Sequence, residues 1–539
     1  MKMIDRRSFL RASAITTASL ALTRKITWAQ STPLATTKAG KISGALIDGI
    51  NVFKGIPYGA DTASKRFKAP VPPAPWTNVL ECNHFTTMAP QLTAARVPSG
   101  LAPRVAGDEG IESEDCLHLN VFTAGLRDHR KRPVLVYFHG GAYNNGTVNS
   151  NFYDGTRLVH RGDVVVVTVN HRLNAFGYLY LGNLSPEYAD SGNAGQLDLI
   201  LALKWVRDNI AEFGGDPSRV LIFGQSGGGA KCAALMATPA ASGLFHRVMT
   251  MSGQQIKGAS IDIAADRAKT VLEKMGVTSG KNLAGQINAL TTAQIQEGAR
   301  AVSADWLPVV DNIILKRNPF DPDAPALSEK VPMILGNVHD ETAVATRGIT
   351  ITWDNAAAVL NTAVNQYLGP YTAEQVVAKF REIHPDYTPD QVDTAAATAF
   401  RAWPGQRWEA ERRAANPVSE PQTWVYQMNF AGANGKAMHT IDIPFMFDNI
   451  AMAEVQIGSA PDQLAAANAL AATMSEMLIQ YGKTGNPNNP GLPHWPAYDL
   501  KNRSTMIWER TPHIENDPRG VERVFADKSH YHQAGTPLP

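Results

Sequence analysis

A serine stands between a short apolar run and an apolar helical segment at residues 220–236, and this arrangement constrains the fold most strongly. The run at residues 220–223 is continuous and rich in β-branched residues, which is typical of a strand buried on both faces of a sheet. Gly-Gln-Ser-Gly-Gly follows at residues 224–228 and fits the pattern G-x-S-x-G. A helix is predicted to begin at about Gly228 and to continue through Met236.

This glycine-rich turn predicts an activated serine. A turn so tight between strand and helix has no room for a Cβ at several positions, so it requires glycine. The turn strains Ser226 and exposes its hydroxyl above the sheet, while the N–H of Gly227 points to where an oxyanion would form. A phosphate-binding loop is the rival interpretation. With its lysine aligned to Lys231, that pattern fails at three positions, because Gln225 and Ala230 stand in place of glycine and Cys232 in place of serine or threonine.

Further apolar runs predict a parallel sheet. They lie at residues 134–138, 164–169, 333–335 and 423–428. Between two of the strands, residues 198–210 carry apolar side chains at helical spacing, and Gly214-Gly215 ends that helix. Strand, helix and strand in this order predict a parallel crossover and a doubly wound α/β sheet. Because there is no internal repeat or low-complexity linker, we expect one large α/β domain over residues 30–539, with inserted helices.

A second glycine cluster, His-Gly-Gly-Ala-Tyr at residues 139–143, follows the strand that ends at Phe138. An oxyanion hole needs two or three backbone N–H groups that converge on one point, and side chains would block the approach. Glycines and one alanine directly after a strand supply that geometry. A flexible turn is the alternative interpretation of this cluster.

Several longer segments match the motifs of one protein family, and they occur in the family's order. They are FKGIPY at residues 53–58, SEDCLHLNV at 113–121, NHRLNAFG at 170–177, the stretch 205–226 that leads into the serine turn, and WPAY at 495–498. Over about residues 40–508 the chain resembles the type-B carboxylesterases, the cholinesterase-like branch of the α/β-hydrolases. The resemblance implies the α/β-hydrolase fold, in which helices flank a large, mixed and mostly parallel sheet and further helices and loops form an inserted cap.

The resemblance also implies an acid residue. The family's acid is a glutamate in a D-E-G motif after a strand, and HDET at residues 339–342 occupies that place. Glu341 is then the acid, and Asp340 is the alternative. Thr342 replaces the family's glycine.

A histidine is implied in the same way. The family's base lies in an H-G-x-E pattern, which corresponds to HTID at residues 439–442. His439 is then the base, although threonine and aspartate replace the family's glycine and glutamate. Serine 226, glutamate 341 and histidine 439 follow one another in the chain order of the α/β-hydrolases.

The family match carries over three oxyanion donors, the N–H groups of Gly141, Ala142 and Gly227, and a serine that supports the acid, Ser252. Together these residues imply hydrolysis of a small-molecule carboxylic ester through an acyl-enzyme, with no metal and no organic cofactor. An amidase or a thioesterase on the same residues is an alternative, as is a non-catalytic binding protein of this fold.

The pocket that would bind the ester is less defined by the sequence. Its aromatic candidates are Trp306, Trp353, Trp403, Trp408 and Phe447. Each of them could equally be a core residue.

Charge and cysteine content exclude other classes. The formal net charge of +1 argues against a nucleic-acid binder, which would show a basic excess. The cysteines are Cys82, Cys116 and Cys232, and no pair has CxxC spacing. The family often pairs the cysteine of its E-D-C-L motif with an upstream one, but here that upstream segment reads MAPQ at residues 88–91. Cys116 is then free unless Cys82 reaches it.

The N-terminus resembles a twin-arginine signal peptide, expected over residues 1–29. Two adjacent arginines, Arg6 and Arg7, precede a weakly apolar stretch at residues 12–22. These 11 residues are too few to span a bilayer, which needs about 20. The resemblance implies export by the twin-arginine machinery to the periplasm or the medium, with no membrane anchor in the mature chain. A basic, frayed terminus is the alternative.

Overall fold

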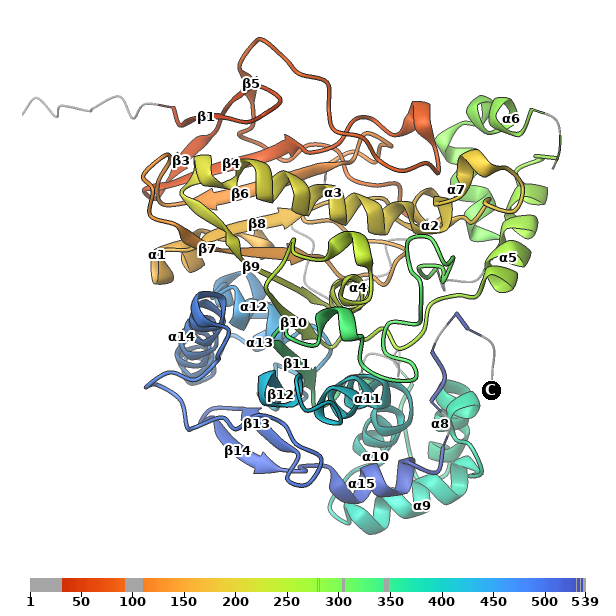
Figure 1. The fold of residues 1–539 in the computed structure, drawn as a ribbon. Coiled ribbons are helices and arrows are strands. Elements are labelled where there is room, and N and C mark those ends of the chain that lie inside the picture. The colour runs from red at the N-terminus through yellow and green to blue at the C-terminus, as the bar shows by residue number, and fades with distance from the viewer. Residues whose placement is uncertain are drawn as a thin grey trace, which may run out of the picture.

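A central sheet organises the part of the chain that the computed structural model describes, which is residues 32–92, 110–278, 280, 282–302, 306–343, 349–529, 531–533 and 535–536. The sheet has 11 strands in the order β14-β13-β12-β11-β10-β9-β7-β8-β6-β4-β3 (Figure 1). All pairs from β13 to β8 are parallel, and the outer pairs are antiparallel. The predicted mixed, mostly parallel sheet is therefore confirmed. The predicted signal peptide lies outside the described residues.

The strands of this sheet are β3 (Ala45–Ile47), β4 (Ile50–Pro57), β6 (His118–Thr123), β7 (Arg132–Phe138), β8 (Val165–Val169), β9 (Gly215–Gln225), β10 (Arg247–Met251), β11 (Met333–Val338), β12 (Thr423–Met428), β13 (Ser504–Trp508) and β14 (His513–Asn516). A small separate sheet contains β1 (Leu34–Thr36), β2 (Lys41–Ser43) and β5 (Leu80–Glu81). Each apolar run that the sequence analysis assigned to a strand is one of these strands. β9 begins earlier than predicted because Gly215 already pairs with Arg132 of β7.

The described α-helices are α1 (Thr156–Gly162), α2 (Asn174–Tyr178), α3 (Ala194–Asn209), α4 (Gly227–Met236), α5 (Ile261–Lys274), α6 (Leu283–Ala289), α7 (Thr292–Arg300), α8 (Ala356–Val364), α9 (Ala373–Ile383), α10 (Pro389–Ala397), α11 (Trp403–Ala414), α12 (Asp442–Met446), α13 (Glu454–Ile457), α14 (Pro461–Thr484) and α15 (Gly520–Ala526). The helix predicted at residues 198–210 is α3, and the chain leaves it through Gly214 in a left-handed conformation, at φ 71°. None of the described helices has the length and apolarity needed to cross a lipid bilayer.

Alternation along β7 divides the core into two layers. Val134 and Val136 point to the face that α3 and α4 cover, and Leu135 and Tyr137 point to the face that α1, α12 and α14 cover. All four side chains are buried. The sheet is therefore buried between helices on both faces, which explains why its strands read as continuous apolar runs.

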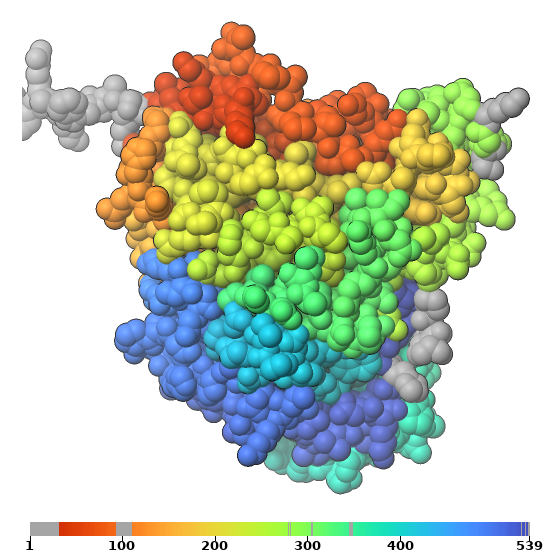
Figure 2. Space-filling view, in the orientation of Figure 1, coloured from red at the N-terminus to blue at the C-terminus, as the bar shows by residue number. Residues whose placement is uncertain are grey.

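Two groups of inserted helices lie beyond one edge of this layered core. Helices α5, α6 and α7 share an apolar cluster with α2, and helices α8, α9 and α10 share another with α15 (Figure 1). They correspond to the insertions that the sequence predicts. In the space-filling view, the N-terminal half of the chain (red to yellow) lies on one side and the C-terminal half (cyan to blue) on the other (Figure 2).

The cysteines do not form disulfides. Cys82, Cys116 and Cys232 are all buried and free. Burial raises the pKa of the Cys82 thiol to about 12, so this side chain stays protonated at neutral pH.

Candidate active site

Ser226 occupies the predicted turn between β9 and α4. Its backbone has φ 55° and ψ −125°, a strained combination for a residue with a side chain. The N–H of Ser226 donates to the carbonyl of Met251 on β10 at 2.7 Å, and its carbonyl accepts from the N–H of Ala230 at 3.0 Å. The neighbouring strand and the following helix therefore hold the serine in this conformation.

Glycine is required where this turn meets the strand beside it. A Cβ on Gly228 would lie 2.0 Å from the carbonyl oxygen of Phe138, the last residue of β7. A Cβ on Gly227 would lie 2.1 Å from the carbonyl oxygen of Ala142. The start of α4 and the loop after β7 are thus in backbone contact, with no room for side chains.

The second glycine cluster forms the other side of this contact. Gly141 and Ala142 both have positive φ, at 89° and 52°. Within the described ranges, no hydrogen bond engages the N–H of Gly141, Ala142 or Gly227. Three backbone donors next to Ser226 are therefore free to bind a ligand oxygen.

The structure brings His439 and Glu341 together. Nδ1 of His439 lies 2.6 Å from Oε2 of Glu341, and Oε1 of Glu341 accepts from the N–H of Val338 at 3.0 Å. Asp340 instead contacts His339, at 3.0 Å, and accepts from the N–H of Ala437 at 2.8 Å. Of the two candidate acids, Glu341 is the one that contacts His439.

Backbone pairing aligns these two loops. Asp340 and Met438 form an isolated parallel bridge, and the N–H of Asp340 donates to the carbonyl of Ala437 at 3.0 Å. The acid and the histidine each follow one residue after this bridge. Their contact is therefore fixed by main-chain bonds as well as by the side chains.

The surroundings of His439 favour its charged form. Burial acts to lower the pKa of His439, but the charge of Glu341 and the hydrogen bond to it act in the opposite direction, and so does the charge of Asp442. The net effect raises the pKa above its ordinary value of 6.5.

Asp442 and Tyr426 also belong to this environment, and no sequence motif assigns them a role there. Asp442 is fully buried, and its Oδ2 accepts from the hydroxyl of Tyr426 on β12 at 2.7 Å. Burial raises the pKa of Asp442 to about 6. The signal in the sequence is an aspartate three residues after the candidate base, at the start of an apolar run, but the family pattern accounts for it only as a replacement for a glutamate.

His439 reaches the residue next to Ser226 rather than Ser226 itself. Among the described residues, the hydroxyl of Ser226 makes no hydrogen bond. The side-chain nitrogen of Gln225 lies 3.2 Å from Nε2 of His439. The imidazole is therefore at the serine turn, but its Nε2 is occupied by an amide.

Ser252 does not make the contact expected of it. Its N–H donates to the carbonyl of Gly336 at 2.7 Å, but its hydroxyl is buried with no hydrogen-bond partner among the described residues. The backbone N–H of Val338 supports Glu341 instead. The serine was assigned from the family motif alone, which does not specify where its hydroxyl points.

A cavity of about 160 Å³ opens beside Ser226. It is lined by Ala142, Tyr143, Ser226, Gly227, Ala230, Ser252, Gly253, Gln254, Gln255, Trp306, Leu307 and Gln533. Two of the candidate oxyanion donors, Ala142 and Gly227, are in its wall. Three glutamines make this wall unusually polar for a ligand pocket, since such pockets are mostly lined by apolar side chains.

Of the aromatic candidates, only Trp306 lines this cavity. Trp353 is 41% exposed, and Phe447 is a core residue that packs against Tyr137 and Phe223. Trp403 lines a different cavity, described next. Trp408 packs against Tyr531.

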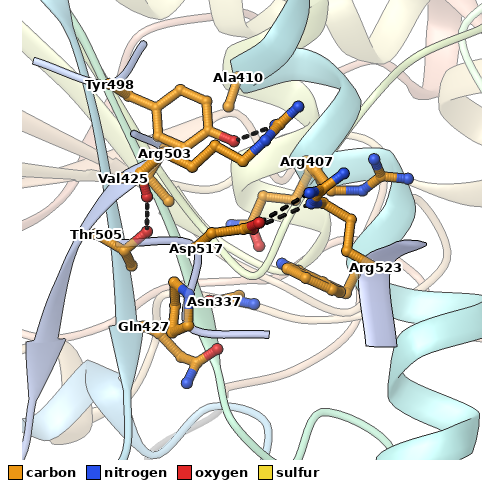
Figure 3. A pocket seen from close by; sticks show the side chains of 13 residues that line it. Asn337, Arg407, Ala410, Val425, Gln427, Tyr498, Arg503, Thr505, Asp517 and Arg523 are labelled. Atoms are coloured by element: carbon orange, nitrogen blue, oxygen red, sulfur yellow. Dashed lines mark hydrogen bonds and ion pairs between the residues drawn. The ribbon is translucent and has the colours of Figure 1, made fainter. Parts of the chain in front are cut away.

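A second cavity of about 30 Å³ lies between α11, the sheet and the segment after β14 (Figure 3). Three arginines surround it, Arg407, Arg503 and Arg523, and each forms an ion pair with a carboxylate. A cavity of this size holds about one water molecule. Its paired charges and its volume make it a structural feature rather than a substrate site.

Comparison with known proteins identifies the family. Residues 31–525 match the carboxylesterase family. The chain belongs to this family. It is 32% identical to the para-nitrobenzyl esterase of Bacillus subtilis (strain 168), over 91% of this chain and 97% of that protein. The resemblance seen in the sequence is confirmed.

Solved structures of similar proteins support the same family and fold. The carboxylesterase EST55 of Geobacillus stearothermophilus is 30% identical with a TM-score of 0.77, over 91% of this chain and 99% of that one. An esterase from Clostridium hathewayi that can hydrolyse aliphatic aromatic polyesters is 30% identical with a TM-score of 0.75, over 93% and 99% of the two chains. This carboxylesterase is therefore a serine-type carboxylic ester hydrolase of the α/β-hydrolase fold.

Asp442→Asn tests the electrostatics around His439. The charge of Asp442 raises the pKa of His439, so its removal lowers that pKa. His439 is the candidate general base, and a general base must be neutral, so activity is expected to fall as pH falls through the pKa of His439. This acid limb is expected to move to lower pH in the variant. The measurement is kcat/KM for a p-nitrophenyl ester between pH 5 and 8.

Asp340→Asn is the matched control for this prediction. It removes a neighbouring carboxylate that binds His339 and the N–H of Ala437 rather than His439. Its acid limb is expected to coincide with that of the wild type. An acid limb that stays in place in Asp442→Asn would contradict the inference that the charge of Asp442 raises the pKa of His439.

Proposed function

We propose that Ser226, His439 and Glu341 are the catalytic triad of this carboxylesterase. The observation that carries the proposal is the contact of 2.6 Å between Nδ1 of His439 and Glu341, beside the strained turn of Ser226. A carboxylate at Nδ1 keeps the proton on that nitrogen and leaves Nε2 as the base. We also propose that the free N–H groups of Gly141, Ala142 and Gly227 form the oxyanion hole.

The reaction has two halves. His439 takes the proton of Ser226 as the hydroxyl oxygen attacks the ester carbonyl, and the carbonyl oxygen becomes an oxyanion bound by the three N–H groups. His439 then gives the proton to the departing alcohol, and an acyl-enzyme remains. A water molecule deprotonated by His439 releases the carboxylic acid and regenerates the serine.

Gln225 must move for the first step. Its amide nitrogen lies 3.2 Å from Nε2 of His439, where the hydroxyl of Ser226 has to bind. Catalytic hydrogen bonds are often long or absent without substrate and tighten when it binds. We expect the Gln225 side chain to rotate away as the ester enters.

Ser226→Ala tests the triad. The variant loses the nucleophile, so hydrolysis of p-nitrophenyl acetate is expected to fall by about 10⁴-fold or more, because the members of a triad act as a unit. Covalent labelling by a fluorophosphonate should also disappear. Circular dichroism is expected to match the wild type, since the hydroxyl makes no hydrogen bond with a described residue. Activity within tenfold of the wild type would overturn the proposal.

The cavity beside Ser226 suggests small acyl groups. Its volume of about 160 Å³ is close to that of an engineered cavity that accepts benzene, about 150 Å³. Gln533 is 8% exposed, and its Oε1 accepts from the N–H of Ile256 at 3.1 Å. Its side-chain nitrogen has no hydrogen-bond partner among the described residues. We therefore propose that the acyl group is short or a single ring, with tolerance for a hydrogen-bond acceptor.

A panel of p-nitrophenyl esters tests this substrate class. With the alcohol held constant, kcat/KM for the butyrate and the benzoate is expected to exceed that for the decanoate by about tenfold or more, because each misplaced methylene costs about 1 kcal/mol or more. Equal or faster hydrolysis of the decanoate would contradict a small acyl site. The butyryl p-nitroanilide and a butyryl thioester, run in parallel, test amidase and thioesterase activity on the same residues.

We further propose that residues 1–29 direct export through the twin-arginine machinery, so that the mature chain is periplasmic or secreted. The adjacent pair Arg6-Arg7 before a weakly apolar stretch supports this. Replacing both arginines with lysine is expected to retain the esterase in the cytoplasm, as measured by cell fractionation. Replacing Arg24 and Lys25 is the matched control, and equal export of both variants would contradict the proposal.

A further inference from the structure

A lysine is buried beside the proposed oxyanion hole. Lys231 lies on α4, the helix that begins directly after Ser226, and its side chain has no exposed surface. Among the described residues it forms no ion pair with a carboxylate, and no carboxylate is among the groups that shift its pKa. Burying an ammonium without a counter-ion costs free energy, so other contacts must compensate for this cost.

Those contacts are with the loop that follows β7. Nζ of Lys231 donates to the carbonyl of Ala142 at 2.6 Å and to the carbonyl of His139 at 3.3 Å. It also lies 5.1 Å from the centre of the Tyr143 ring. Carbonyl oxygens and an aromatic face are the partners that stabilise a buried cation when no carboxylate is present.

The two carbonyls flank the peptides that carry the proposed donors. The N–H of Gly141 belongs to the peptide whose carbonyl, that of Gly140, contacts Nδ1 of His139 at 2.8 Å. The N–H of Ala142 belongs to the peptide whose carbonyl, that of Gly141, accepts from the N–H groups of Asn144 and Asn145 at 3.1 Å. Lys231 therefore binds the two peptides on either side of this pair, so that the carbonyl of each residue from 139 to 142 has a polar contact.

We propose that Lys231 is a positioning residue of the oxyanion hole, which holds the loop at residues 139–142 in place through its carbonyls and adds a positive charge behind the developing oxyanion. The proposal rests on the function proposed above. It differs from a packing role because the charge of the ammonium acts on the transition state more than on the bound ester.

The charge of Lys231 depends on pH near neutrality. Burial lowers the pKa of Lys231 to about 7. Its neighbours do not titrate there, since burial lowers the pKa of His139 to about 3 and that of His171 also lies well below its ordinary value. Burial raises the pKa values of Tyr143 and Cys232, so both stay neutral. The positive charge is thus lost as pH rises through about 7.

Among the described residues linked to Tyr143 by hydrogen bonds, Glu409 also has a pKa near neutrality. Tyr143 donates to the side chain of Gln255 at 2.8 Å, and the N–H of Gln255 donates to Glu409 at 2.6 Å. Burial raises the pKa of Glu409 to about 8. A decline in activity above pH 7 must therefore be assigned with variants of both residues.

Lys231→Met is the central test, because methionine keeps the length and apolar volume of the stem. We expect kcat for a p-nitrophenyl ester to fall by about 10- to 100-fold, less than the loss of an oxyanion donor itself, with KM changed less than about threefold. The affinity for a trifluoromethyl ketone, whose adduct carries an oxyanion, should fall in parallel. The alkaline limb of the wild-type kcat/KM profile should disappear.

Three further variants separate the effect of charge from that of packing. Cys232→Ala changes an equally buried residue of the same helix and should keep kcat within about threefold of the wild type while retaining the alkaline limb. Glu409→Gln should also keep the limb near pH 7. Lys231→Gln keeps two N–H donors without the charge, so it should recover part of kcat without restoring the limb.

Several outcomes would overturn the proposal. Wild-type kcat in Lys231→Met would do so, as would a reduced kcat with the alkaline limb intact. If neither Lys231 variant folds, the test is the affinity of the wild-type enzyme for the trifluoromethyl ketone as a function of pH. This affinity should weaken between pH 7 and 9. A constant affinity would exclude an effect of the Lys231 charge. Failure of the triad itself is distinguished by Ser226→Ala, which would then remain active.

Discussion

The site depends on one close backbone contact, where the end of β7 meets the start of α4. The carbonyls of Phe138 and Ala142 would lie 2.0 and 2.1 Å from side chains at Gly228 and Gly227, so only glycine permits the approach. This contact sets Ser226 in its strained conformation beside the loop that presents the free N–H groups. A substitution here would displace the proposed nucleophile and the proposed oxyanion donors together, because both belong to the same packed turn.

Parallel strands supply the rest of the geometry. β9, β10, β11 and β12 lie side by side and parallel, so the segments that follow them emerge at one edge of the sheet. Ser226 follows β9 directly, and Glu341 lies just after β11. The longer segment after β12 returns to bridge Asp340 with Met438, which places His439 against the acid. Glu341 and His439, 98 positions apart along the chain, thus meet through strand order and one short bridge.

Local patterns predicted the fold well because they report local burial. The apolar runs are strands since a sheet covered on both faces requires apolar residues at every position. The same patterns could not show that the hydroxyl of Ser252 has no hydrogen-bond partner among the described residues, or that Lys231 on α4 contacts the loop after β7. The family's H-G-x-E pattern has glycine where Thr440 stands, and Thr440 does adopt a positive φ, at 80°. Such positions are determined by tertiary contacts across the sheet edge, which no single segment encodes.

Buried charged groups lie on both sides of the proposed reaction centre. In the proposed reaction the transition state carries a negative oxyanion and a positive imidazolium, and buried groups of opposite sign lie near each. Lys231 contacts the oxyanion loop, while Glu341 and Asp442 act on His439. Burial lowers the pKa of Lys231 and raises that of Asp442, so Lys231 loses its charge as pH rises and Asp442 loses its charge as pH falls. In a low-dielectric site these fixed charges need no reorganisation during the reaction, and their titration makes the electrostatic contribution to catalysis greatest close to neutral pH.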